Sequence, residues 1–101
     1  MATYTVTHKQ VNDNYAVVAT LTPNEIEVGQ SITISGMGAT YNGTHTVVAT
    51  PQYLYVGIDT EGDLLYDTTI ILLNQVLFAL TTDDVERTAA TGTITYAPTC
   101  T

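Results

Sequence analysis

VGQSITISGMGATYNGTHTVVAT, from Val28 to Thr50, contains two short runs with the alternation of polar and apolar residues that is typical of β-strands. The runs are Ser31–Ser35 and Thr44–Ala49, and the segment between them holds two glycines and the Asn42-Gly43 pair. Glycine and Asn-Gly adopt positive φ at little steric cost. The stretch therefore predicts two antiparallel strands joined by a tight loop.

The same alternation continues on both sides of this stretch. Threonine is frequent throughout the chain, and β-branched residues suit a pleated, half-buried surface. Further strands are predicted at 15–22, 53–58 and 92–96, and within Ser31–Ser35 we expect Ile32 and Ile34 to point inward. The chain of 101 residues fits one domain. We predict an all-β fold, a small antiparallel β-sandwich or barrel of immunoglobulin-like type.

Two segments leave a choice between strand and helix. Leu64–Leu80 is the least polar part of the chain, and it fits either two buried strands or one short helix with an apolar face. We favour strands, because no capping residue precedes the segment; its continuous apolarity indicates burial on both faces, in the core or against a neighbouring subunit. Near residues 82–88, threonine followed by Asp83 and Asp84 predicts a single helical turn.

The two ends of the chain carry weaker patterns. Residues 1–10 are predicted as either an edge strand or a mobile N-terminal arm, because terminal segments order only when something ties them down. Residues 97–101 form an unpatterned tail. The N-terminus has no apolar core of a signal peptide and no segment has the length of a membrane span, so we expect the protein to be made in a cytoplasm and to have no membrane partner.

The charge balance is strongly acidic. Lys9 and Arg87 are the only basic residues against ten carboxylates, for a net charge of −8. A protein that binds a phosphate backbone needs clustered cations, so direct nucleic-acid binding is not expected. The hydrophobic share of 45% argues against disorder, which needs low hydrophobicity together with high charge.

The densest carboxylate cluster is Asp59, Glu61 and Asp63 around Gly62. The calcium loop of helix-loop-helix proteins has alternate acidic residues, a glycine and a later bidentate glutamate. Here the glycine comes too early and Ile70 occupies the place of the glutamate. We interpret the cluster as an acidic hairpin tip, since turns favour these residue types.

No catalytic, cofactor-binding or metal-binding residue is predicted. His8 and His45 each lack a second ligand at metal spacing, and Cys100 has no sequence context that marks a reactive thiol. Asn42-Gly43-Thr44 matches a glycosylation acceptor, but the turn interpretation explains the same residues. The seven tyrosines, notably Tyr53, Tyr55 and Tyr66, serve either sheet packing or a carbohydrate- or protein-binding surface.

Two motifs resemble a known family. Val28–Gly36 followed by Tyr41–Val47 has the form VGxxVTISG...(Y/F)NGTxTV and resembles a small β module of tailed-bacteriophage virion proteins. Asn74–Phe78 and Asp83–Gly92 are similar to the N-terminal region of head-to-tail connector (adaptor) proteins of phages that infect actinobacteria. The resemblance covers roughly residues 17–101.

The resemblance implies a non-enzymatic structural component of the virion, most simply at the head-tail connector, with capsid decoration or a tail position as alternatives. Its partners would be portal, capsid or tail subunits and further copies of itself, and it would be made in the host cytoplasm. A carbohydrate-binding or adhesive β-domain is the alternative of another class. We expect assembly through apolar segments and strand edges, with these interface residues: Tyr4, Val6, Tyr53, Tyr55, Ile70, Leu72, Val76 and Phe78.

Overall fold

The structure, a computed structural model, describes residues 2–96, and in that range it contains strands and no helix. The nine strands are β1 (Ala2–Asn12), β2 (Tyr15–Thr20), β3 (Ser31–Ser35), β4 (Gly43–Ala49), β5 (Tyr53–Ile58), β6 (Leu64–Ile71), β7 (Gln75–Ala79), β8 (Val85–Ala89) and β9 (Thr93–Tyr96). The predicted all-β fold is confirmed. Of the two predicted architectures, sandwich and barrel, the structure has the barrel.

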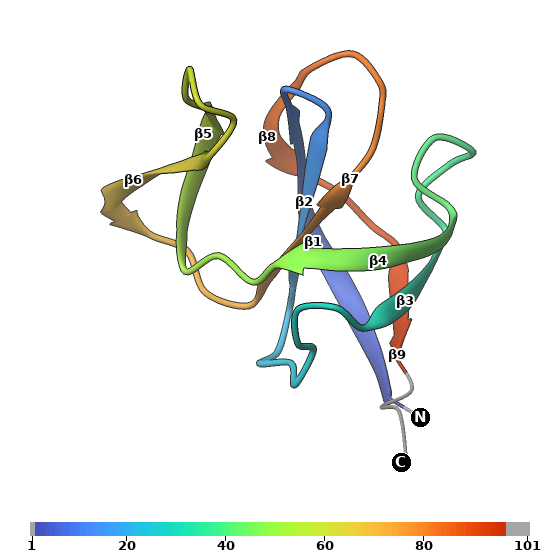
Figure 1. Cartoon of the computed structure of the whole chain (residues 1–101). Coiled ribbons are helices and arrows are strands. Elements are labelled where there is room, and N and C mark those ends of the chain that lie inside the picture. Colours follow the sequence, from blue (N-terminus) through green and yellow to red (C-terminus); the bar gives the residue numbers. More distant parts are fainter. Residues whose placement is uncertain (1, 97–101) are drawn as a thin grey trace.

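Six strands close the barrel in the order β2-β7-β4-β3-β9-β1, and β1 pairs again with β2 (Figure 1). Closure depends on the length of β1. Along one edge its first residues pair with β9 and its last residues with β8, while its other edge pairs with β2. β8 is therefore a seventh strand, whose backbone pairs with β1 alone among the described strands.

The N-terminal strand is a central element, neither an edge strand nor a mobile arm. Residues 2–12 pair with three other strands, and this backbone pairing ties the segment down. A two-residue turn follows it: Asp13 and Asn14 have φ of 51° and 64° between β1 and β2. Asparagine and aspartate tolerate this left-handed conformation, which suits a two-residue hairpin.

The β3–β4 hairpin confirms the prediction for Val28–Thr50. Ile32 and Ile34 are buried on one face of β3 while the residues between them are exposed, and the strands pair antiparallel from Ser31↔Thr46 to Ile34↔Gly43. In the connecting loop the side chain of Asn42 accepts a hydrogen bond of 3.0 Å from the backbone N–H of Met37. The asparagine therefore shapes the loop that the sequence predicted.

The main core fills the barrel. Its largest buried members come from six strands, and two loop residues, Ile26 and Tyr41, join it. His45 stacks on Phe78 with ring centroids 4.2 Å apart, and its Nε2 lies 2.7 Å from the carbonyl oxygen of Tyr41. This histidine is therefore a packing residue at the edge of the core.

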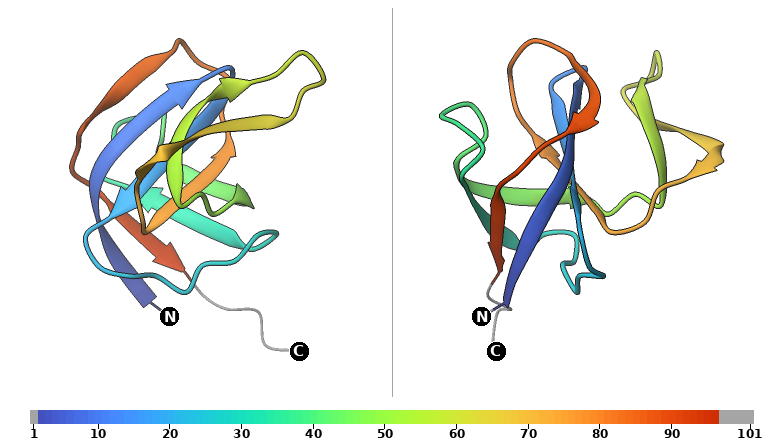
Figure 2. Two further views of the ribbon diagram at one scale, coloured as in Figure 1. Left: turned by 90° about the vertical axis from the view of Figure 1, so that its left-hand side faces the viewer. Right: turned by 180° about the vertical axis from the view of Figure 1, so that it is seen from behind.

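β5 and β6 form a separate two-stranded hairpin that stands beside the barrel (Figures 1 and 2). A second, smaller core lies between them and the barrel, with Tyr55 of β5 packed against Val17 of β2 and Leu77 of β7. Because the barrel core covers the opposite faces of β2 and β7, both strands are buried on both faces. This burial explains their continuous apolar sequences.

Of two predictions for the second half of the chain, one is wrong and the other, strands in Leu64–Leu80, is confirmed. The predicted helical turn near 82–88 is wrong: Val85–Ala89 is strand β8, because Val85 pairs with Val11 and this tertiary pairing overrides the local cap signal. Leu64–Leu80 forms strands, as favoured, and Asn74 with φ of 62° separates them. The predicted tail, 97–101, lies outside the described residues.

Candidate functional site

The hairpin carries a cluster of exposed apolar side chains. Leu65 and Ile70 on β6 are each 41% exposed, Ile71 is 68% exposed, and Leu73 just beyond the strand is 58% exposed. We call these four residues the hairpin surface. Single exposed apolar residues are normal, but a group of large ones on one element marks an interaction surface.

β6 also presents an open strand edge. Its backbone pairs with β5 and with no other strand of the described chain. The register shifts so that Tyr53 pairs with Ile71 while Leu54 pairs with Asp67, which leaves the residues between as a bulge in β6. Thr69 donates from its N–H and its hydroxyl to the Asp67 carboxylate at 3.0 and 2.5 Å, and these hydrogen bonds lower the pKa of Asp67.

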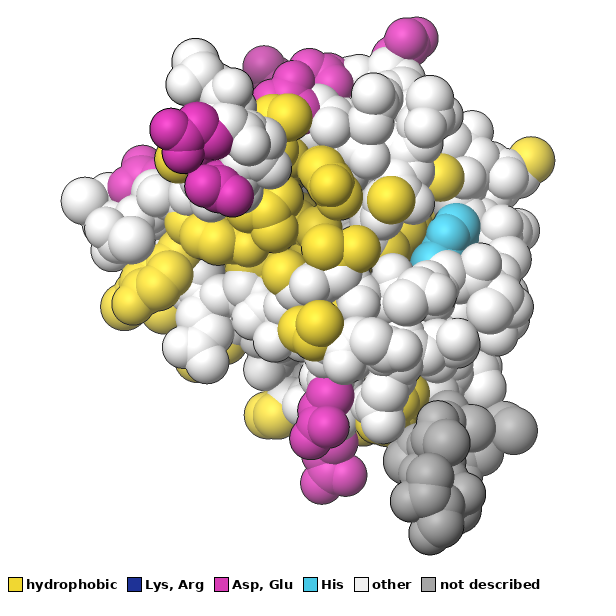
Figure 3. Space-filling view, in the orientation of Figure 1, with side chains coloured by type: hydrophobic (Ala, Val, Ile, Leu, Met, Phe, Trp, Pro, Cys, Tyr) yellow, Lys and Arg dark blue, Asp and Glu magenta, His cyan; other side chains and the backbone are white. Residues whose placement is uncertain are grey.

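A shallow apolar cavity of about 340 Å³ adjoins the hairpin. It is lined by side chains from β4, β5 and β6, among them Val48, Tyr53 and Tyr66, and by Val28 from the loop before β3. Burial raises the pKa of the Tyr66 hydroxyl. In Figure 3 hydrophobic side chains form a band that starts at the hairpin and continues across the middle of this face, with acidic side chains above it. The cavity and the hairpin surface together are the main candidate docking surface.

Tyr55 fixes the hairpin to the barrel. Its side chain is fully buried, and its hydroxyl donates a 2.8 Å hydrogen bond to the carbonyl oxygen of Asn12 on β1. Burial, together with the negative charge of Asp13 and other neighbours, raises the pKa of this hydroxyl to about 12. In the opposite direction, the Asn12 amide donates to the carbonyl oxygen of Val56 at 3.2 Å.

Gln75 is a second buried anchor. At the start of β7, its Nε2 lies within 3.3 Å of the carbonyl oxygens of Pro51, Tyr53 and Leu72. Its Oε1 accepts a 2.8 Å hydrogen bond from the guanidinium of Arg87 on β8. Gln75 therefore holds the segments that enter and leave the hairpin, and burial lowers the pKa of Arg87.

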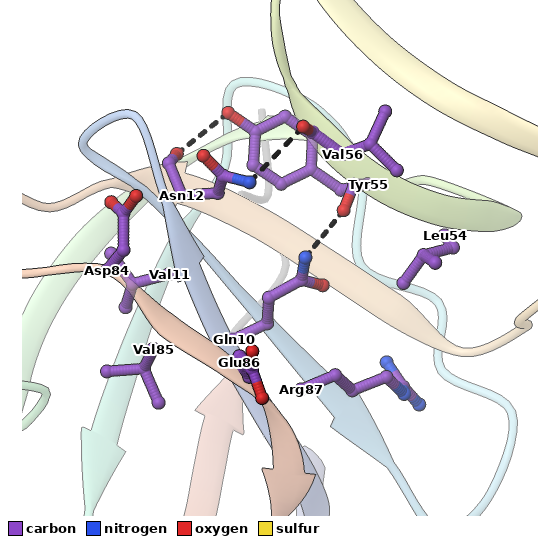
Figure 4. Close-up of a pocket in the computed structure, with 10 residues that line it drawn as sticks. All are labelled: Gln10, Val11, Asn12, Leu54, Tyr55, Val56, Asp84, Val85, Glu86 and Arg87. Carbon is purple, nitrogen blue, oxygen red and sulfur yellow. Dashed lines mark hydrogen bonds between the residues drawn. The ribbon is translucent and has the colours of Figure 1, made fainter.

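A second cavity, of about 660 Å³, lies between β5 and β8 above the face of β1 (Figure 4). Gln10 of β1 lies at its floor; the amide nitrogen donates a 2.5 Å hydrogen bond to the carbonyl oxygen of Tyr55. The Gln10 side-chain oxygen, in contrast, is buried and has no hydrogen-bond partner within the described chain. Leu54 and Val56 of β5 line one wall, and residues 84–87 line the other.

The eight predicted interface residues divide into two groups. Tyr4, Tyr53 and Leu72 are half-buried and Ile70 is exposed, so these four remain accessible. The other four are corrected to core residues, since each is at most 2% exposed inside this chain: Val6, Tyr55, Val76 and Phe78. These four side chains are covered by the rest of this chain and not by a neighbouring subunit.

The acidic tip of the hairpin is held by its own side chains. The Asp59 carboxylate accepts hydrogen bonds from the N–H groups of Glu61 and Asp63 at 2.8 and 3.0 Å, which is the local turn chemistry expected of aspartate. Among residues 2–96 no group of three or more His, Cys, Asp or Glu side chains is arranged to hold a metal ion. Cys100 lies outside the described residues.

The sequence did not single out Gln10, Gln75 or Arg87 as site residues. A signal existed, because Gln75 precedes the apolar run Val76–Phe78 and Arg87 is one of two basic residues in the chain. A polar residue in a strand that is buried on both faces has to find hydrogen bonds there. The partners themselves come from distant segments, and sequence spacing does not identify them.

Comparison with protein-family models, with curated proteins and with solved structures gave no match. In the described part of the chain there is no helix with the length and apolarity needed to cross a bilayer.

Proposed function

We propose that this protein is a non-enzymatic structural subunit of a tailed-phage virion, located at the head-tail connector, with capsid decoration or a tail position as the alternative sites. Its partners are portal, capsid or tail subunits and further copies of itself, and it is made in the host cytoplasm before it enters the particle. The observation that carries the proposal is the hairpin surface next to the open edge of β6.

An open edge and an exposed apolar surface on the same hairpin suit assembly. Unpaired backbone groups of an edge strand accept a further strand, and this form of recognition combines main-chain hydrogen bonds with side-chain pockets. Covering the half-exposed leucine and isoleucine side chains contributes roughly 1 kcal/mol each. In a monomer both features favour aggregation, whereas in a particle neighbouring subunits cover them.

The distribution of charge agrees with a position beside DNA without binding it. Lys9 lies with its ammonium group 5.1 Å from the centre of the Tyr41 ring, and Arg87 binds Gln75. Both basic side chains thus have intramolecular partners, and the net charge is −8. A channel lined by such subunits repels the phosphate backbone and lets DNA pass.

The test has two parts: whether purified phage particles contain the chain, and whether the purified chain forms oligomers. Mass spectrometry and electron microscopy of purified phage particles from the source of this sequence should find the chain in many copies. Sedimentation analysis should show concentration-dependent oligomers that Ile71→Asp weakens. Leu21→Asp is the matched control, because Leu21 is 67% exposed and directly follows β2, outside β5 and β6. A chain that stays monomeric and is absent from particles contradicts the proposal.

A carbohydrate-binding or adhesive domain is the second candidate. The observation that favours it is the shallow cavity lined by Tyr53 and Tyr66, since tyrosine supplies rigid amphipathic contact area. Tyr55 contributes nothing to such a surface because it is buried. Glycan-array binding that Tyr53→Ala abolishes supports this function, and binding to no glycan, or binding that survives the substitution, counts against it.

A further inference from the structure

We propose that the cavity between β5 and β8, here called the β5–β8 groove, binds a lysine or arginine side chain of a partner protein. The inference does not rest on a role in a virion, because it follows from the groove alone. The residues that carry it are Gln10 at the floor, Leu54 and Val56 on β5, Asp84 just before β8, and Glu86 and Arg87 on β8.

The first argument is the unpartnered oxygen of Gln10. The residue is only 7% exposed, and its Nε2 is committed to the carbonyl oxygen of Tyr55, which fixes the orientation of the amide. Figure 4 shows the side-chain oxygen turned away from Tyr55, toward the space between Leu54 and Arg87. A buried acceptor without a donor is unfavourable, so a ligand that donates a hydrogen bond there gains affinity.

The second argument is the charge of the groove lining. The register of β1 and β8 shifts so that Glu86 and Arg87 both lie opposite Gln10, and Asp84 lies at the other end. Two carboxylates and one guanidinium give the lining a net charge of −1. Arg87 donates one N–H to Gln75, and the acceptors at this end are the Glu86 carboxylate and the Gln10 side-chain oxygen. A cationic donor fits these two acceptors.

The third argument is the apolar wall. Leu54, Val56 and Val85 also line the groove, and Val56 is 45% exposed. Lysine and arginine place an aliphatic stem on apolar surface and keep a charged head on polar groups. The groove offers apolar side chains for the stem and acceptors for the head group. Because the Gln10 oxygen is buried at the floor, the head group reaches it only when Arg87 gives up its hydrogen bond to Gln75 and moves aside.

The experiment is a titration of the ¹⁵N-labelled protein, followed by NMR, with the methylamides of N-acetylarginine, N-acetyllysine and N-acetylcitrulline. Citrulline has the shape of arginine without its charge. We expect saturable millimolar binding of the arginine or the lysine probe, with shifts in the side-chain amide of Gln10 and in residues 54–56 and 84–87. The citrulline probe should bind at least about tenfold more weakly, since charge-assisted hydrogen bonds are roughly twice as strong as neutral ones.

Two variants locate the site. Glu86→Gln should weaken binding about threefold, the size expected for an exposed ion pair, while the same substitution at Glu61 on the hairpin tip should leave it unchanged. Gln10→Leu should abolish binding, with a thermal melt to check folding; if it does not fold, Glu86→Gln carries the test. The proposal is overturned by equal binding of citrulline, by no saturable shift, or by an NMR contact showing that Arg87 already donates to Gln10 in the free protein.

Discussion

Removing the hydroxyl of Tyr55 should loosen the β5–β6 hairpin by an amount that can be estimated from one hydrogen bond. In Tyr55→Phe the ring still fills the space between Val17 and Leu77, but the Asn12 carbonyl oxygen loses its 2.8 Å donor. A buried group left without its partner costs about 1–3 kcal/mol. We therefore expect the free energy of hairpin opening to fall by about 2 kcal/mol, which raises the open population about 30-fold.

Native-state hydrogen exchange measures this opening residue by residue. In the wild type, amides of β5 and β6 should exchange with a lower opening free energy and a smaller denaturant dependence than amides of the barrel, because the hairpin has its own small core. Tyr55→Phe should lower both sets equally, since global unfolding also breaks the hydrogen bond. Ile34→Val, inside the barrel, should lower only the barrel amides, by about 1 kcal/mol.

Tyr53→Phe is the matched control on the same strand, where the tyrosine is half-buried, and it should change little. The reasoning is refuted if hairpin and barrel amides exchange with one opening free energy and one denaturant slope, because the hairpin is then no separate unit. It is also refuted if Tyr55→Phe leaves the exchange of β5 and β6 unchanged.

Three further predictions follow from the same contacts. The raised pKa of Tyr55 makes its contribution to stability complete below pH 10 and lost as the pH rises through about 12, so urea unfolding in alkali should be steeper in pH for the wild type than for Tyr55→Phe. Gln75→Leu should cost at least about 2 kcal/mol in chemical denaturation, because it leaves several carbonyl groups and Arg87 without a partner. Gly57→Ala should destabilise more than Gly62→Ala: both residues have positive φ, but only at Gly57 does the added Cβ meet a neighbour, at 2.7 Å from the Asp13 carboxylate.

Local alternation predicted most of the strands, although not β8, and it could not predict which strands meet. In β3 the buried Ile32 and Ile34 lie between exposed polar residues, so the sequence alone defines the inward face. β1 is different, because its polar Gln10 is buried. Its outward face is covered by β5, some 45 residues further along the chain, and nothing in the local pattern indicates that cover.

The apolar segment Leu64–Leu80 shows why the candidate site was predicted only in part. The sequence predicts burial of the segment, in the core or against a neighbouring subunit; within this chain β7, after Asn74, is buried, and much of β6, before it, is exposed. Before it, Ile70 and Ile71 of β6 are exposed; after it, Val76 and Phe78 of β7 are core residues. Both halves contain runs of large apolar residues, so the tertiary position of each strand decides which run is buried.

The two edges of the hairpin differ in whether a further strand can pair with them. Along β5, the carbonyl oxygens of Tyr53, Tyr55 and Val56 accept hydrogen bonds from side-chain amides of Gln75, Gln10 and Asn12. Carbonyl groups that are occupied in this way do not pair with a further strand. β6 has no such cover among the described residues, and it carries the exposed leucine and isoleucine side chains. A neighbouring subunit that extends this sheet must therefore add at β6, and the bulge at Asp67–Ile70 limits the register in which it pairs.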